Sequence, residues 1–95
     1  MICKKVRLQR KEADGYVIPL GPVNLVCITT NAGMIACGAF DIHILDTAAR
    51  IKSISGAPLV SVEDLLINPV NDANKSAAKR GIRSGMTGKE ALDLH

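Results

Sequence analysis

The segment that most constrains the fold is the apolar stretch from Val23 to Asp41, VNLVCITTNAGMIACGAFD. Its first half is rich in β-branched residues, which favour strands. Asn31-Ala32-Gly33 then offers a three-residue hairpin loop, because Gly33 can adopt the left-handed conformation that closes such a loop. We therefore predict a β-hairpin whose strands cover residues 23–30 and 34–38.

A helix is predicted directly after this hairpin, over residues 42–49. Asp41 is a suitable N-cap, and Ile42, Leu45 and Ala49 recur at helical spacing. Residues 50–55 alternate in polarity. We interpret them as a further strand, with the tail of the preceding helix as the alternative.

The N-terminal part of the chain is also strand-like. Residues 2–9 alternate between a mostly apolar side and a mostly charged side, which predicts a strand. Residues 10–15 are interpreted as a turn and residues 16–20 as a short second strand. Pro19 and the Gly21-Pro22 pair break a hydrogen-bonded ladder, so this second strand is expected at an edge or in a loop.

The C-terminal half carries helix signals. Ser61 caps a predicted helix that ends at Leu66, and residues 72–80 form a polar helix that Gly81 stops. Thr87-Gly88-Lys89-Glu90 fits the capping-box pattern for a last helix over residues 89–94. Strands first and helices second predict an α+β fold: a small, mostly antiparallel sheet of N-terminal strands and a central hairpin, with helices packed on one face.

Length and composition narrow the class of protein. Ninety-five residues, of which 47% are apolar, predict a single globular domain over residues 1–95. No apolar run is long enough for a membrane span. Three cysteines, an odd number, without a secretory signal predict reduced thiols and a cytoplasmic location. The basic residues are dispersed and only one Tyr and one Phe are present, which disfavours nucleic-acid binding.

Two of the cysteines lie in the predicted hairpin. With a three-residue loop, Thr30 pairs with Met34, and Cys27 lies directly opposite Cys37, with Cβ atoms about 4.5–5.5 Å apart. Such thiols could touch, share a metal or form a labile disulfide. A two-residue loop would place Cys27 opposite Gly38 instead. Plain packing is the alternative that we favour, because free cysteines are often buried.

The turn after the hairpin is the sharper candidate for chemistry. In Cys37-Gly38-Ala39-Phe40-Asp41 a thiol ends a strand and faces a helix N-terminus, which can lower a thiol pKa. Cys37, Gly38 and Asp41 are thus the candidate ligand or thiol site, and a structural turn capped by Asp41 is the alternative that we favour. His43 is a weaker candidate. Because no Cys-x-x-Cys pair is present, we predict no metal site, and the residues identify no cofactor.

The glycine-rich, basic segment 81–88 precedes the last predicted helix. Backbone N–H groups at residues 87–90 could bind an anion with help from Arg83, although the spacing of a phosphate-binding Walker loop is absent. Capping of the helix is the alternative that we favour. The weaker candidate residues here are Arg83, Gly85, Gly88 and Lys89.

Three blocks of sequence carry a family resemblance: Asn24-Leu25-Val26, GMIACGAFD at residues 33–41, and GIRSGMTGKEAL at residues 81–92. Together they resemble the YunC-like family, small bacterial and archaeal proteins classed as a domain of unknown function. The resemblance covers residues 20–95 and is weakest over residues 50–74. It implies a single small α+β domain and no established reaction. Its recognisable motif positions are Cys37, Gly38, Asp41, Gly85 and Gly88.

Two functions remain open from the sequence. A small domain with a long apolar hairpin is expected to expose apolar area, and no set of nucleophile, base and orienting residue is evident. We therefore expect a homo-oligomeric binding or assembly module, a dimer or a trimer. The alternative is a small-molecule enzyme or thiol-dependent ligand binder that uses the Cys37-Gly38-x-x-Asp41 turn, with Arg83 or Lys89 contributing from the tail.

Overall fold

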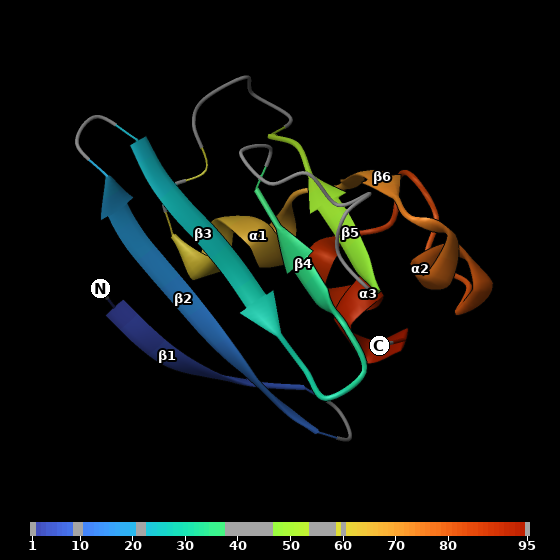
Figure 1. Ribbon diagram of the computed structural model, residues 1–95, viewed down its shortest axis with the longest axis horizontal. Coiled ribbons are helices and arrows are strands. Elements are labelled where there is room, and N and C mark those ends of the chain that lie inside the picture. The colour runs from blue at the N-terminus through green and yellow to red at the C-terminus, as the bar shows by residue number, and fades with distance from the viewer. Residues whose placement is uncertain are drawn as a thin grey trace.

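In the part of the chain that the structure describes, three helices accompany a six-stranded sheet (Figure 1). The computed structural model describes residues 2–8, 11–20, 23–37, 47–53, 59 and 61–94. The strands are β1 (Ile2–Arg7), β2 (Glu12–Leu20), β3 (Val23–Thr29), β4 (Met34–Ala36), β5 (Ala48–Ile51) and β6 (Val70–Ala73), and they lie in the sheet in this order. The helices are α1 (Val62–Ile67), α2 (Lys75–Lys79) and α3 (Gly88–Leu94).

Neighbouring strands are antiparallel except for β4 and β5, which are parallel. In Figure 1, α1 and α3 lie behind the sheet, and α2 lies at one end of the molecule beside β6. The predicted α+β class, with a mostly antiparallel sheet and helices on one face, is confirmed.

The core lies between the sheet and helices α1 and α3. Val26, Ile28 and Ile35 point from the middle strands into it and are wholly buried. Leu65 of α1 and Leu92 of α3 meet them and are also wholly buried. Burial of a side chain of this size contributes about 1.5–3 kcal/mol, so these contacts hold the helices on the sheet.

Strand β2 is longer than predicted. Residues 12–15 were interpreted as part of a turn, and this is wrong, because they pair with β1 from Lys4↔Gly15 to Arg7↔Glu12. Gly15 has a packing reason to be glycine: a Cβ there would lie 2.7 Å from a methyl group of Val62 in α1. The residue that looked like a turn signal instead lets the helix approach the sheet closely.

The predicted edge position of residues 16–20 is wrong for Tyr16 and Val17, which pair with both β1 and β3, whereas residues 18–20 pair with β3 and lie beyond the described pairing with β1. Pro19 is tolerated at this place for a simple reason. The pairing with β1 begins at Ile2↔Val17, and Pro19 lies beyond it, paired with Asn24 of β3. Pro19 therefore needs no ladder bond on its β1 side.

The hairpin of β3 and β4 is confirmed, but its register differs from the prediction. Thr29 pairs with Met34, and the N–H of Thr30 donates to the carbonyl of Gly33 at 2.8 Å. The Thr30 hydroxyl also accepts from the N–H groups of Ala32 and Gly33 at 3.2 Å. This side chain closes the turn, so Asn31 and Ala32 alone form the tip.

Gly33 does not adopt the left-handed conformation that the sequence suggested. Among the described residues, positive φ occurs at Gly81 and Gly85 and at no other position. The Thr30 hydroxyl makes a left-handed residue unnecessary, because it satisfies the N–H groups of the tip itself.

Strand β5 replaces part of the helix predicted over residues 42–49. Asp41 and residues 42–46 lie outside the described residues, but Ala48 and Ala49 belong to β5, so the predicted helix end is wrong. Both alanines are wholly buried, and Ala49 pairs in parallel with Ile35. The strand expected over residues 50–55 is confirmed at Arg50 and Ile51, and it begins earlier than predicted.

The polar helix predicted over residues 72–80 begins only at Lys75. Asp72 and Ala73 lie in β6, where they pair with β5, and this pairing overrides their helical pattern. Asn74 separates the two elements. Its side-chain oxygen accepts from Ala77 N–H at 3.0 Å and from Ala48 N–H at 3.2 Å, which joins α2 to β5.

Gly81 ends α2 as predicted, with a φ of 92°. The N–H of Gly81 donates to Ala78, and the N–H of Ile82 donates to Ala77, which together form a Schellman motif. Ile82 is 1% exposed and anchors this turn to the core. The end of α2 is therefore well determined by its own sequence.

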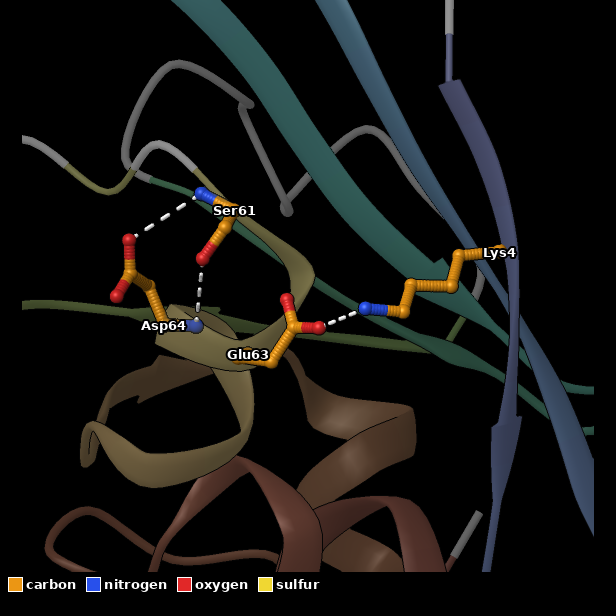
Figure 2. A network of polar contacts seen from close by, with 4 residues as sticks. All are labelled: Lys4, Ser61, Glu63 and Asp64. Carbon is orange, nitrogen blue, oxygen red and sulfur yellow. Dashed lines mark hydrogen bonds and ion pairs between the residues drawn. The ribbon is translucent and has the colours of Figure 1, made fainter.

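Helix α1 has the predicted cap and extends to Ile67, one residue beyond the predicted end. The hydroxyl of Ser61 accepts from Asp64 N–H, and the Asp64 carboxylate accepts from Ser61 N–H, both at 3.2 Å. Figure 2 shows this capping box and, beside it, the ion pair that joins Glu63 of α1 to Lys4 of β1. The ion pair ties the edge strand to the first turn of the helix.

Candidate functional site

The face of the sheet opposite to α1 and α3 is the first candidate site, and we call it the outer face. Alternate residues of each strand point to it, because side chains alternate along a strand. Its apolar members on the four central strands are Tyr16, Ile18, Leu25, Cys27, Met34, Ala36 and Ala48. Its charged members are Lys5, Arg7, Glu12, Asp14, Arg50 and Asp72.

The centre of the outer face is apolar. Ile18 of β2 lies directly opposite Leu25 of β3, and Tyr16 lies opposite Cys27. Tyr16, Ile18 and Leu25 are half-buried, although none of the described helices covers this face. Sequence reasoning missed these three residues as a site, and their alternation along β2 was the available signal.

Charged pairs flank this apolar centre. Lys5 and Asp14 form an ion pair with a 2.6 Å contact, and the hydrogen bond that Lys5 donates to the Asp14 carboxylate raises the pKa of Lys5. At the other side of the apolar centre, the Nη2 atom of Arg50 lies 3.6 Å from the Oδ2 atom of Asp72 on the neighbouring strand. The charged members of the outer face comprise three basic and three acidic residues, so the described part of this face is balanced in charge.

The predicted opposition of Cys27 and Cys37 is wrong. Cys27 pairs with Ala36, because the hairpin tip is one residue shorter on the β4 side than we expected. Cys37 follows β4 and belongs to the core, whereas Cys27 lies on the outer face. The alternative pairing of Cys27 with Gly38 is wrong for the same reason.

Burial raises the pKa of the Cys27 thiol, and the nearby Cys37 raises it further. Cys27 is therefore held in its protonated form at neutral pH, which opposes reactivity. Cys37 is 5% exposed and packs among core side chains, and its N–H donates to the Val26 carbonyl at 3.0 Å. Cys3, on β1, is the exposed cysteine.

The candidate thiol site is only partly described. Cys37 occupies the core position given above, while Gly38, Asp41 and His43 lie outside the described residues. A thiol or ligand site at this turn therefore stays a prediction. Within the described part of the chain, no group of three or more His, Cys, Asp or Glu side chains could hold a metal ion.

The segment 81–88 has a structural role at the edge of the sheet. Gly85 has a φ of 98°, and its N–H donates to the Val70 carbonyl at 2.9 Å. The Val70 N–H donates in turn to Met86 at 2.7 Å, and Pro69 bridges Thr87. These bonds occupy the outer edge of β6, where an open strand could pair with another chain.

Gly88 is required by close packing, since a Cβ there would collide with the Leu65 carbonyl of α1. The predicted capping box is confirmed: Thr87 N–H donates to the Glu90 carboxylate at 3.1 Å, and Glu90 N–H donates to the Thr87 hydroxyl at 3.2 Å. Gly88 N–H donates to Asn68 at 3.0 Å. These N–H groups are engaged, which fits capping better than anion binding.

Arg83 of this segment and Lys89, directly after it, are exposed. Gly85 and Gly88 thus have separate structural roles, one in a turn and one in packing against α1.

A hollow of about 320 Å³ lies beside the tip of the β3–β4 hairpin. Its size is at the lower end of the range for small-ligand sites. None of the described residues that line it is charged, and the Thr30 hydroxyl is already engaged in the turn. Its lining residues are Thr29, Thr30, Asn31, Ala32, Gly33, Met34 and Thr47. Binding of a small-molecule ligand therefore stays a prediction, and the properties of this hollow do not identify it as the binding site.

Comparisons with known proteins identify the family. The model of the domain of unknown function DUF1805 matches residues 36–94. The uncharacterized protein YunC of Bacillus subtilis (strain 168) is 31% identical over 90 residues, which cover 92% of this chain and 89% of YunC. The chain therefore belongs to the DUF1805 family, and the YunC-like resemblance of its sequence is confirmed.

The fold has a known counterpart. The crystal structure of TA1206, a protein of unknown function from Thermoplasma acidophilum, superposes with a TM-score of 0.83 at 22% identity. The match covers 97% of this chain and 89% of that one. In the described residues, no helix is long and apolar enough to cross a membrane.

Proposed function

We propose that this domain is a homo-oligomeric assembly module whose subunits associate through the outer face. The observation that carries the proposal is the run Leu25-Val26-Cys27-Ile28 in β3. An antiparallel strand with one solvated face alternates between apolar and polar residues, whereas a strand covered on both faces is apolar throughout. β3 is antiparallel to both neighbours and apolar at all four positions.

The apolar centre continues onto β2, where Ile18 lies opposite Leu25. An apolar patch of paired side chains within a charged rim is the usual arrangement of a protein interface. Removing these side chains from water contributes about 25 cal/mol per Å² of apolar area. The cross-strand pair is therefore the expected centre of the contact.

A second copy of the chain suits this face better than an unrelated partner whose surface carries charges of a single sign. Balanced basic and acidic residues let two identical faces meet without net repulsion, and each sign can find the other across a two-fold axis. A dimer needs this single self-complementary patch, whereas a trimer needs two different patches on each subunit. We therefore favour a dimer over a trimer.

Substitution on the two sides of the sheet tests the proposal. Leu25→Glu places a charge in the centre of the outer face and is expected to give a monomer by light scattering coupled to size exclusion. Ile67→Glu is the matched control, because Ile67 is 69% exposed at the end of α1, on the other side of the molecule. The control is expected to remain dimeric. Equal masses for both variants would remove the outer face from the proposal.

We further infer a cytoplasmic location, which the free thiols support. Cys3, Cys27 and Cys37 are all unpaired in the structure, and a reducing compartment maintains cysteines in this state. Thiol trapping in freshly lysed cells should find all three labelled after denaturation. A disulfide-linked fraction that persists under trapping would argue for an oxidising compartment.

A further inference from the structure

Five of the twelve basic residues of the chain lie within a short segment, residues 74–89, that contains no acidic residue. Four of them occupy α2 and the turn that follows it, and all four are exposed. We call these four the α2 basic cluster: Lys75, Lys79, Arg80 and Arg83. Lys89, at the start of α3, is the fifth cation and is also exposed.

The α2 basic cluster gathers four exposed cations that have no carboxylate partner among the described residues, whereas several cations elsewhere are paired. Lys4, Lys5 and Arg50 each form an ion pair with a carboxylate. Among the residues that the structure describes, no carboxylate pairs with any member of the α2 basic cluster. Lys75 and Lys79 also share one face of α2 at i, i+4 spacing, an arrangement that mildly destabilises a helix.

An ordered backbone presents these charges. Asn74 caps α2 at its start, and the Schellman motif at Gly81 closes its end. Arg83 sits between Ile82, which is buried, and Gly85, whose N–H is bonded to Val70. Cations on such a scaffold lose little backbone freedom when they bind, so unpaired charge here favours a ligand of opposite sign.

We propose that the α2 basic cluster binds an acidic segment of a partner protein. In Figure 1, α2 protrudes at the end of the molecule opposite to β1. Leu94 lies beside the cluster, because a Cβ on Gly81 would be 3.9 Å from its Cδ1 atom, and it is 41% exposed. A segment that carries carboxylates and one apolar side chain would match both the cations and this leucine.

Nucleic acid and membrane fit the cluster less well. Helix α2 is only five residues long, too short to read a groove, and the segment 74–89 itself contains no aromatic residue on which a base could stack. On an anionic membrane, Leu94 would insert together with Glu90, which shares its helix face, and with its neighbour Asp93. Those carboxylates would meet anionic headgroups, whereas a flexible peptide can avoid them.

Fluorescence anisotropy of a labelled Glu-rich peptide that carries one Leu tests this proposal with the full chain. The cluster variant replaces all four cations by Gln, and its affinity is expected to fall at least about tenfold, because each exposed ion pair contributes modestly. The matched control makes the same change in net charge at four cations that belong neither to the α2 basic cluster nor to the named members of the outer face, and it is expected to change affinity less than about twofold. The control positions are Lys4, Arg10, Lys11 and Lys52.

Two measurements protect the test from trivial outcomes. Circular dichroism checks that both variants are folded, and the milder Arg80→Gln, Arg83→Gln variant should still lose about threefold in affinity.

Equal losses in the cluster variant and the control would overturn the proposal. Tighter binding of the wild-type protein to duplex DNA or to phosphatidylserine vesicles at the same ionic strength would also overturn it. Because α2 lies outside the outer face, the mass of the dimer is expected to be unchanged in the cluster variant.

Discussion

The two faces of one sheet differ in what covers them. On the core face, Val26 and Ile28 of β3 are wholly buried under α1 and α3. On the outer face, Leu25 of the same strand is half-buried and paired with Ile18, and none of the described helices lies over it. The same strand thus carries apolar residues towards both faces, but the described helices cover only one of them. This difference is the reason to expect a second subunit.

The largest expected effect comes from truncation on the core face. Ile28→Ala should lower the free energy of unfolding by about 2–5 kcal/mol, because it removes buried methyl groups and leaves a cavity. Leu25→Ala, in the same strand but on the outer face, should cost less than half of that in the dissociated monomer. Urea denaturation at low protein concentration compares the two. Similar losses would mean that the faces are equally buried within one subunit.

A second substitution tests how closely α1 approaches the core face. Gly15→Ala should cost about 1–3 kcal/mol, because the new methyl group overlaps Val62. The double variant Gly15→Ala, Val62→Ala should recover part of that loss, since the smaller residue in α1 leaves space for the methyl group. Thermal unfolding of the two single variants and the double variant gives the coupling. Purely additive losses would contradict the packing described here.

The raised pKa of Cys27, on the outer face, makes the free energy of unfolding depend on pH. Because Cys27 has a raised pKa in the folded state, the folded protein holds its proton more tightly than the unfolded chain does. The resulting contribution to stability is complete below the unfolded thiol pKa of about 8.5 and is lost as the pH rises through it towards the folded pKa. Cys27→Ala should flatten this alkaline decline.

Thiol labelling of the native protein gives an independent check of the same assignment. Iodoacetamide should modify Cys3 well before Cys27 or Cys37, since it is the exposed cysteine. Rapid labelling of Cys37 in the native state would instead favour the thiol site that the sequence suggested.

The smallest expected effect concerns the ion pair between β1 and α1. The hydrogen bond from Lys4 lowers the pKa of Glu63, so the pair stabilises the fold above the unfolded pKa of Glu and loses this effect as the pH falls through the folded pKa. Both side chains are about half exposed, and Lys4→Ala should cost less than about 1 kcal/mol near neutral pH. Acid denaturation of Lys4→Ala should show a weaker dependence on pH than that of the wild type.

Local signals in the sequence predicted the fold class and the positions at which several helices begin or end. The cap at Ser61, the stop at Gly81 and the capping box at Thr87 depend on neighbours within a few residues, and all three are confirmed. In the sequence, Gly85 and Gly88 were visible as family-motif positions and as weaker candidates for an anion site. Their reasons, a left-handed turn and a contact with α1, require the tertiary structure.

Long-range pairing explains the elements that the sequence did not predict. Gly15 looked like a turn residue because the approach of Val62 cannot be read from one segment. Asp72 and Ala73 looked helical because their pairing with β5 is distant in sequence. The register of the hairpin depended on one hydroxyl, that of Thr30, and its shift by one residue moved Cys27 away from Cys37.

The claim that the outer face is covered by a second subunit can be tested with an internal probe. Tyr16 is the only tyrosine, the chain has no tryptophan, and Tyr16 lies opposite Cys27 on the outer face. Acrylamide quenching of its fluorescence should therefore weaken as protein concentration rises and the dimer forms, while Leu25→Glu stays quenchable throughout. If quenching of the wild type is constant from low to high micromolar concentration, the outer face is not the site of assembly.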